Sequence, residues 1–149
     1  MDFTLTEEQQ MIVDSLGKYA IKELKPIALE YRDRLIPMEK MRDIQRNLLD
    51  FGVGIGMVPE ELGGMGLDAF TMGLLQFEIA KISPDIAITS LIQMTVGKLL
   101  PLVPQHLREE YVVPVLAGDK LGCIGMSEPD AGSQVTAVNC RARLDGDEY

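Results

Sequence analysis

Residues 6 to 118 repeat one pattern, in which apolar residues recur every three or four positions and proline or glycine interrupts the series. This spacing predicts amphipathic α-helices that pack on one another. Thr6 and Gln9 have the spacing of a capping box, and Asp68 has the position of an N-cap residue. Helices are expected over residues 6–31 with a kink at Pro26, 37–52, 69–82, 84–103 and 104–118.

Two short apolar runs follow the last expected helix, over residues 121–126 and 137–144, and each predicts a β-strand. Asp145 and Gly146 predict a hairpin turn, with a return strand that begins at Asp147. The expected fold is therefore mainly α. A helical domain covers residues 1–120, and residues 121–149 form the first strands of a β-domain that is truncated at the end of the sequence.

The composition excludes several classes of protein. A net charge of −9 argues against a nucleic-acid binder, which needs a basic face. No apolar run is long enough to span a membrane. Cys123 and Cys140 lie far apart with no histidine beside them, so we expect no metal site and predict buried, reduced thiols. The first residues have neither a basic signal region nor an Arg-rich transit helix, which predicts a cytoplasmic protein.

The run from Gly125 to Ser133 follows the first expected strand and has the composition of an anion-binding loop. Gly132 has no Cβ, so a phosphate can approach the backbone closely, and Ser133 adds a hydroxyl. Pro129 fixes its own backbone angle and would end the strand. An ordinary β-turn is the alternative, because Pro, Asp, Gly and Ser are common turn residues.

Three segments resemble the acyl-CoA dehydrogenase family in the same order along the chain. Residues 121–133, with Ser-Glu-Pro and then Gly-Ser, resemble its flavin-binding signature; residues 58–67 resemble its Pro-Glu-Glu-aromatic-Gly-Gly loop; and residues 1–9 are similar to its usual opening. Ser127 stands where Thr is commoner in the family, Gln134 where Asp usually follows Gly-Ser, and Leu62 where an aromatic residue is usual. The change at residue 134 removes a carboxylate and puts the role of that position in doubt.

The resemblance implies FAD as cofactor and oxidation of an acyl-CoA to a 2-enoyl-CoA. In this family a glutamate removes the α-proton while the β-hydrogen leaves as hydride to the flavin, and the electrons pass to an electron-transferring flavoprotein. That glutamate belongs to a C-terminal helical domain, so no catalytic residue is expected in this chain. The family also implies a homotetramer of the full-length protein. By motif position, the residues implied at the flavin are Ile124, Gly125, Met126, Ser127, Gly132 and Ser133, and Ser133 is also near the substrate.

The helix expected over residues 84–103 would line the acyl pocket, and the residues near the pocket positions are Ile88, Thr89, Ile92 and Gln93. The segment Leu-Gly-Cys-x-Gly before the flavin motif resembles the glutaryl-CoA dehydrogenase branch. In that branch an arginine early in this helix meets the substrate carboxylate. The corresponding position in this chain is at or near Asp85, and the chain has no Lys or Arg from residue 82 to 97. An uncharged acyl or aryl-acyl chain is therefore the expected substrate.

Two alternatives stay open at this point. A flavin acyl-CoA oxidase of the same superfamily would differ by direct reoxidation of its flavin by O2. A helical interaction module without catalysis would lack the further β-segment and the four helices that the family has after this region.

Overall fold

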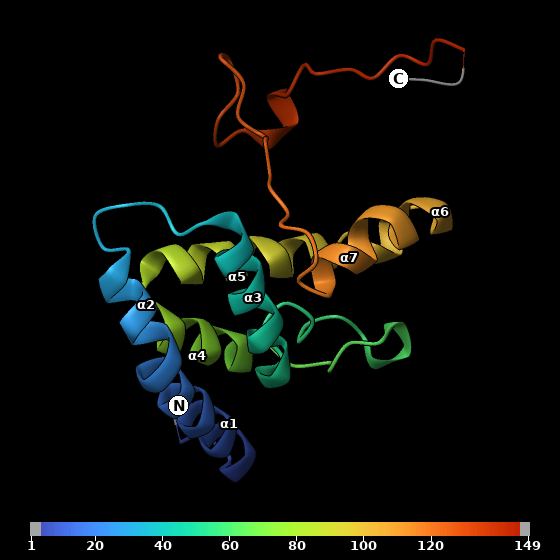
Figure 1. Ribbon diagram of the computed structural model, residues 1–149. Coiled ribbons are helices and arrows are strands. Elements are labelled where there is room, and N and C mark those ends of the chain that lie inside the picture. The colour runs from blue at the N-terminus through green and yellow to red at the C-terminus, as the bar shows by residue number, and fades with distance from the viewer. Residues whose placement is uncertain (1–3, 147–149) are drawn as a thin grey trace.

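The computed structural model describes residues 4–146 (Figure 1). Its helices are α1 Glu7–Tyr19, α2 Lys25–Glu30, α3 Met38–Leu48, α4 Ala69–Ala80, α5 Pro84–Gly97, α6 Gln105–Leu107 and α7 Val113–Leu116. Short 3₁₀ turns lie at Leu49–Phe51, Glu60–Leu62, Leu100–Leu102 and Val135–Ala137, and π-helical turns at Ala20–Leu24 and Arg108–Val112. The predicted helical domain is confirmed.

Two prolines inside helical segments account for the two π-helical turns. A proline has no N–H to donate, and its ring clashes with the carbonyl of the residue four positions earlier. Widening the preceding turn relieves that clash. The turn at Ala20–Leu24 therefore precedes Pro26 in the first turn of α2, and the turn at Arg108–Val112 precedes Pro114 in α7.

The carbonyl oxygen of Glu110 shows what Pro114 changes. In a regular α-helix this oxygen would accept a hydrogen bond from the N–H of residue 114, which proline lacks. It accepts instead from Lys120 Nζ at 3.1 Å. A side chain beyond the end of α7 thus replaces the missing backbone donor.

The helix α5 ends six residues earlier than the sequence pattern predicts, at Gly97 instead of Val103. Pro101 has no N–H to donate to the carbonyl oxygen of Gly97, so the α-helical ladder cannot continue. A 3₁₀ turn at Leu100–Leu102 carries the chain onward, and Pro104 is the N-cap residue of α6.

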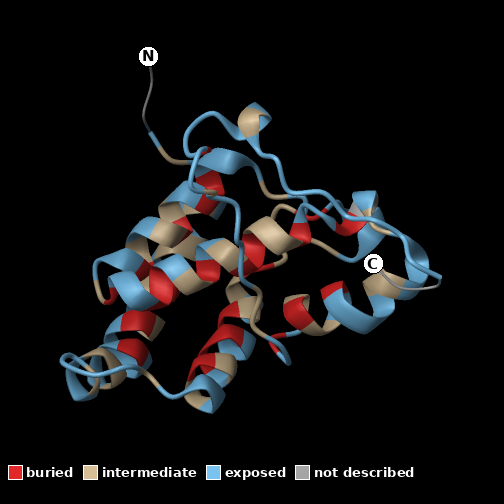
Figure 2. Ribbon diagram, turned by 90° about the horizontal axis from the view of Figure 1, so that it is seen from above, coloured by how far each residue is buried: buried red, intermediate tan, exposed pale blue. Residues whose placement is uncertain are grey.

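The main core lies between α1, α3, α4 and α5 (Figure 2). Its fully buried side chains include Leu16, Leu48, Leu75, Ile79 and Ile86. The helix α4 packs against both α1 and α5, and it shares the core with each. A smaller cluster of Val58, Leu100 and Val112 joins the loop after α3 to the far end of α5 and to the last helical turns.

The strand predictions over residues 121–126 and 137–144 are wrong for the described part of the chain. Residues 121–127 have no regular secondary structure and no ladder partner among the described residues, and residues 135–137 form a 3₁₀ turn. A strand needs the backbone of a neighbouring strand, whereas a helix satisfies its hydrogen bonds within itself. After α7 the chain leaves the helical body and runs away from it (Figure 1).

The hairpin predicted at Asp145 is only partly described. Gly146 has the positive φ of a tight turn, at 65°, while the return strand from Asp147 lies outside the described residues. Within the described range, no helix combines the length and the apolar character that crossing a membrane requires.

Candidate functional site

The segment after α7 is organised by a tight turn at residues 128–131. Glu128 and Ala131 exchange two backbone hydrogen bonds, of 2.9 and 3.2 Å, with Pro129 and Asp130 between them. The Glu128 carboxylate also accepts from the backbone N–H of Asn139 at 2.7 Å and from that of Cys140 at 2.8 Å. One side chain therefore ties the turn to the chain that follows it.

The six residues implied at the flavin lie on both sides of this turn. Ile124, Gly125, Met126 and Ser127 precede it and are exposed, and Gly132 and Ser133 follow it and are exposed as well. A Cβ atom placed on Gly125 or on Gly132 would meet nothing within 4 Å. No described protein group accepts from the backbone N–H groups of residues 124–127. The turn and the open segment coexist, so a β-turn does not argue against an anion-binding loop.

The prediction of buried thiols is wrong. Cys123 and Cys140 are both free, as expected, but both are exposed. They lie on the segment that leaves the helical body, where the described residues provide no core to cover them. Among the residues described, no three His, Cys, Asp or Glu side chains gather into a possible metal site.

An apolar groove between α4 and α5 contains one of the predicted pocket residues. The groove has a volume of about 520 Å³ and is lined by Gly73, Gln76, Phe77, Ala80, Pro84, Ala87, Ile88 and Leu91. Ile88 is 54% exposed there and Phe77 is 63% exposed. Gln76 Nε2 is buried beside them, without a hydrogen-bond partner among the described groups. The groove is thus apolar with one unpaired amide donor in its wall.

The other predicted pocket residues lie elsewhere on α5. Thr89 donates its hydroxyl to the carbonyl oxygen of Asp85, at 2.9 Å. Ile92 is half-buried and, like Thr89, is absent from the lining of the groove. Gln93 is buried, and its Nε2 donates to the carbonyl oxygens of Val115 and Lys120, both at 3.0 Å. The structure therefore does not bring these four side chains to one surface.

The Glu60–Glu61 loop and His106 have no special environment. Glu60 and Glu61 form an exposed 3₁₀ turn with Leu62, and His106 is exposed in α6. The sequence places Gln93 near the pocket but gives no signal for its hydrogen bonds to Val115, Lys120 and Gly122, because these residues lie on other parts of the chain. It also missed the pair of Arg46 with Asp119, which are 73 residues apart and have no local pattern that links them.

Comparison with known proteins identifies relatives of this chain. Residues 6–119 match the family described as acyl-CoA dehydrogenase, N-terminal domain. The human mitochondrial short-chain specific acyl-CoA dehydrogenase is 31% identical over 152 residues, which is 97% of this chain and 35% of the human protein. The short-chain specific acyl-CoA dehydrogenase of Clostridium acetobutylicum is 30% identical, over 100% of this chain and 39% of that protein.

A solved glutaryl-CoA dehydrogenase in complex with glutaryl-CoA is also similar in structure. It is 28% identical, with a TM-score of 0.74, over 93% of this chain and 35% of that chain. The chain thus spans less than two fifths of the length of the curated relatives described above. Because a family pattern covers residues 6–119, and relatives align along nearly the whole chain, this chain belongs to the acyl-CoA dehydrogenase family.

Proposed function

We propose that this chain is the N-terminal part of an FAD-dependent acyl-CoA dehydrogenase, which oxidises an acyl-CoA thioester to a 2-enoyl-CoA. The observation that carries the proposal is the open segment around the turn at residues 128–131, within a chain that belongs to this family. In the proposed division, residues 1–120 form the helical domain and residues 121–149 begin a β-domain.

The residues of this segment fit a flavin with a diphosphate. The exposed backbone N–H groups of residues 124–127 and the Ser127 hydroxyl would donate to the flavin edge. Gly132 and Ser133 would contact the diphosphate, because the space beside Gly132 is open and Ser133 has an exposed hydroxyl. FAD, when bound, supplies the acceptor for the hydride from the substrate.

The proposed substrate is an acyl-CoA with an uncharged acyl or aryl-acyl group. From residue 82 to 97 the chain has no Lys or Arg, so α5 offers no cation to a second carboxylate of the substrate. The groove beside Ile88 is apolar, which suits an acyl chain. Thr89, Ile92 and Ser133 stay proposed substrate contacts. Gln93 would reach the substrate only if it released its hydrogen bonds.

The remaining parts of the proposal concern the longer protein. We propose that the catalytic glutamate belongs to a C-terminal helical domain, and that no residue of this chain acts as the base. An electron-transferring flavoprotein is the proposed electron acceptor, a homotetramer the proposed assembly and the cytoplasm the proposed location. The family membership of the chain supports the proposed glutamate, electron acceptor and assembly, but it does not bear on the location.

The test is to express the longer coding sequence that contains this chain and to add a panel of acyl-CoAs without oxygen. Bleaching of the flavin absorbance and formation of an enoyl-CoA are the expected results. Reoxidation by an electron-transferring flavoprotein, and slow reoxidation by O2, would separate a dehydrogenase from an oxidase. A longer protein that binds no flavin would contradict the proposal and favour the non-catalytic interaction module.

A further inference from the structure

One buried side chain, Gln93, holds the point at which the proposed flavin-binding segment leaves the helical domain. Its Nε2 donates to the carbonyl oxygens of Val115 and Lys120, and its Oε1 accepts from the backbone N–H of Gly122 at 2.6 Å. Both N–H groups and the oxygen of the amide are therefore used. The three partners span the end of α7 and the start of the extended segment.

The packing around Gly122 leaves no room for a side chain at this position. A Cβ atom on Gly122 would lie 2.6 Å from Val96 Cγ2 and 3.2 Å from Gln93 Oε1. These distances are shorter than van der Waals contact, so the backbone of residue 122 lies directly against α5. The neighbouring Leu121 packs against the main core.

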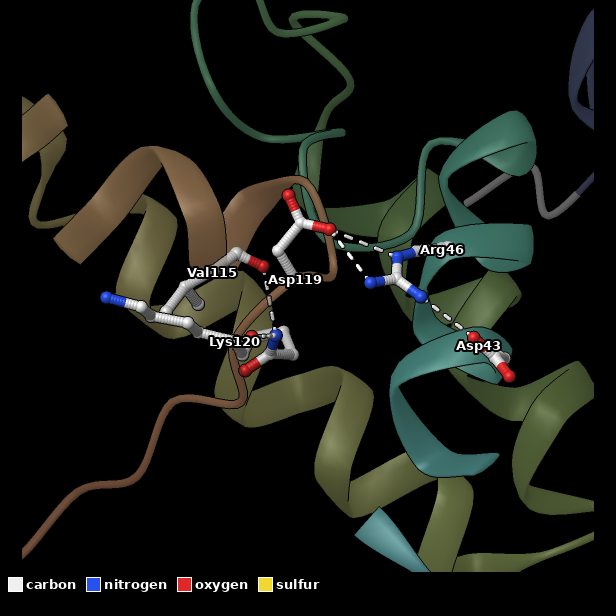
Figure 3. A network of polar contacts seen from close by, with 6 residues as sticks. Asp43, Arg46, Val115, Asp119 and Lys120 are labelled. Atoms are coloured by element: carbon white, nitrogen blue, oxygen red, sulfur yellow. Dashed lines mark hydrogen bonds and ion pairs between the residues drawn. The ribbon is translucent and has the colours of Figure 1, made fainter. Parts of the chain in front are cut away.

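A second anchor at this junction is exposed. Arg46 Nη2 and Nε donate to Asp119 Oδ1 at 2.9 and 3.2 Å, and Arg46 Nη1 is 2.8 Å from Asp43 Oδ1 (Figure 3). Exposed ion pairs contribute little, because water screens them. The buried amide of Gln93 contributes more to stability. Without it, the backbone groups that it pairs with would be left buried and without a hydrogen-bond partner.

No hydrogen bond in the described structure ties residues 123–127 to the helical domain. The proposed flavin-binding residues therefore start at Ile124, two residues after Gly122, which is the last position that is hydrogen-bonded to the helical domain. The hydrogen bond from the Gly122 N–H to Gln93 Oε1 is the last described one between the helical domain and this segment. The same helix carries the proposed acyl-pocket residue Ile88, so Gln93 links the pocket helix to the flavin segment.

We propose that Gln93 is a positioning residue, which holds the backbone of Lys120 and Gly122 so that Ile124–Ser127 meets the flavin at a fixed distance from α5. The flavin part of this inference rests on the proposed function. It assigns Gln93 a role different from the acyl contact that the resemblance implies. Gln93 itself touches neither the substrate nor the cofactor.

The test compares Gln93→Met with wild type in the full-length protein loaded with FAD. Methionine has nearly the same volume but none of the hydrogen bonds. Because the Gly122 N–H loses its acceptor, its hydrogen exchange should accelerate by about tenfold. At saturating acyl-CoA the rate of flavin reduction should fall by up to about 100-fold, because a displaced reacting group is costly. Acyl-CoA affinity should change little, and the flavin absorption band should shift.

Gln45→Met is the matched control. Gln45 is also buried, but the hydrogen bond described for its Nε2 is one to Met41 Sδ, at 3.7 Å within the same helix. The control should leave both Gly122 exchange and flavin reduction at the wild-type values. If Gln93→Met does not fold, Gln93→Asn replaces it, because the shorter amide cannot reach residues 120 and 122 together.

Unchanged Gly122 exchange in the Gln93 variant would show that the side chain does not hold the segment, and would overturn the inference. Faster exchange with normal flavin reduction would overturn the positioning role alone. A wild-type protein without FAD would contradict the proposed function, while Gly122 exchange would still decide whether Gln93 anchors the segment.

Discussion

At the scale of single residues, the polar groups at helix ends behave as their spacing predicts. Thr6 and Gln9 form the capping box of α1, with each side chain bonded to the other residue's backbone N–H at 3.1 Å. Gln9 Nε2 also donates to the Thr71 hydroxyl, which donates to the Asp68 carboxylate at 2.7 Å. The N-termini of α1 and α4 are therefore joined by one chain of hydrogen bonds.

Asp68 gives a prediction about pH. Hydrogen bonds from Thr71, first through its hydroxyl, lower the pKa of Asp68 below the usual 3.8. A lowered folded-state pKa stabilises the fold above the unfolded value, and that contribution disappears as pH falls through the folded value. Asp68→Asn keeps a good cap residue without the charge. Wild type should melt at a higher temperature than D68N at pH 7, and the gap should close below about pH 4.

Thermal unfolding followed by circular dichroism at pH 7, 5 and 3 measures this gap. Asp33→Asn is the control, because the structure describes no hydrogen bond to the carboxylate of Asp33, an exposed residue in the turn after α2. A gap between wild type and D68N that stays constant down to pH 3 would mean that the charge of Asp68 contributes nothing.

Ser133 gives a prediction about cofactor affinity in the full-length protein. Its side chain is exposed, and no described protein group hydrogen-bonds to its hydroxyl. Loss of one hydrogen bond to a charged group costs about 1.5–3 kcal/mol, so Ser133→Ala should weaken FAD or acyl-CoA binding by roughly tenfold or more. Titration of the apoprotein measures this, with Ser127→Ala, which should change flavin reduction instead, for comparison. Unchanged affinity would leave Ser133 as a turn residue only.

At the scale of elements, local patterns predict the helices well and the strands badly. Apolar periodicity and caps place the starts of α1, α3 and α4 within about one residue, because a helix satisfies its hydrogen bonds locally. The effect of Pro101 on the end of α5 could have been inferred from the missing N–H. The strands at 121–126 and 137–144 could not form from local sequence alone, since strand pairing depends on distant backbone.

Only the part of the candidate site that lies in one continuous sequence motif was predictable. The segment 124–133 is recognisable from its residue types, and its turn and exposure agree with the prediction of a loop. The role of Gln93 depends on Val115, Lys120 and Gly122, which are 22 to 29 residues away along the chain. Helical periodicity places Gln93 on α5 but does not say which backbone groups face its amide.

The helix α5 gives a prediction that separates core from groove. Ile86 is fully buried, whereas Ile88 is 54% exposed in the groove beside α4. Ile86→Ala should therefore destabilise the fold by about 2–5 kcal/mol. Ile88→Ala should cost about 1 kcal/mol, because only part of its side chain is buried. Chemical denaturation of both variants measures the difference.

The same pair tests the pocket in the full-length protein. If Ile88 lines it, Ile88→Ala should raise kcat/KM for a longer acyl-CoA relative to a shorter one, since each methylene contributes about 1–3 kcal/mol to selectivity. Ile86→Ala serves as the control and should leave that ratio unchanged. Equal ratios for wild type and both variants would remove Ile88 from the pocket.

The loop after α3 gives a prediction about a hollow. Leu62 stands where the family usually has an aromatic residue, and it lines a hollow of about 270 Å³ with Val58, Leu100 and Leu116 among others. Leu62→Phe should fill part of this space and stabilise the fold by roughly 0.5–2 kcal/mol. Leu102→Phe, at a position that is 78% exposed, should change the melting temperature little. A lower melting temperature for the Leu62 variant would show that the hollow cannot accept a ring.

At the scale of the whole molecule, the helical domain and the flavin segment differ in what supports them. The helical domain has a continuous core, with Leu16, Leu48, Leu75 and Ile86 fully buried. Beyond Gly122 the chain is exposed at most positions, and its own turn is its main internal structure (Figure 2). The helical domain should therefore fold by itself, whereas the segment after Gly122 should not by itself retain a cofactor that needs an enclosed site.

Retention of FAD by the 149-residue chain tests this difference. A tightly held cofactor needs a site that encloses most of its surface, whereas Ile124 and Met126 are 47% and 51% exposed and the space beside Gly125 and Gly132 is open. The chain provides one wall of the proposed site, so we expect it to fold with high helix content but to lose FAD during gel filtration. The longer protein, treated in the same way, is the control and should elute with bound flavin. A yellow, stoichiometric complex of the 149-residue chain would show that residues 124–133 close around the cofactor without further contacts.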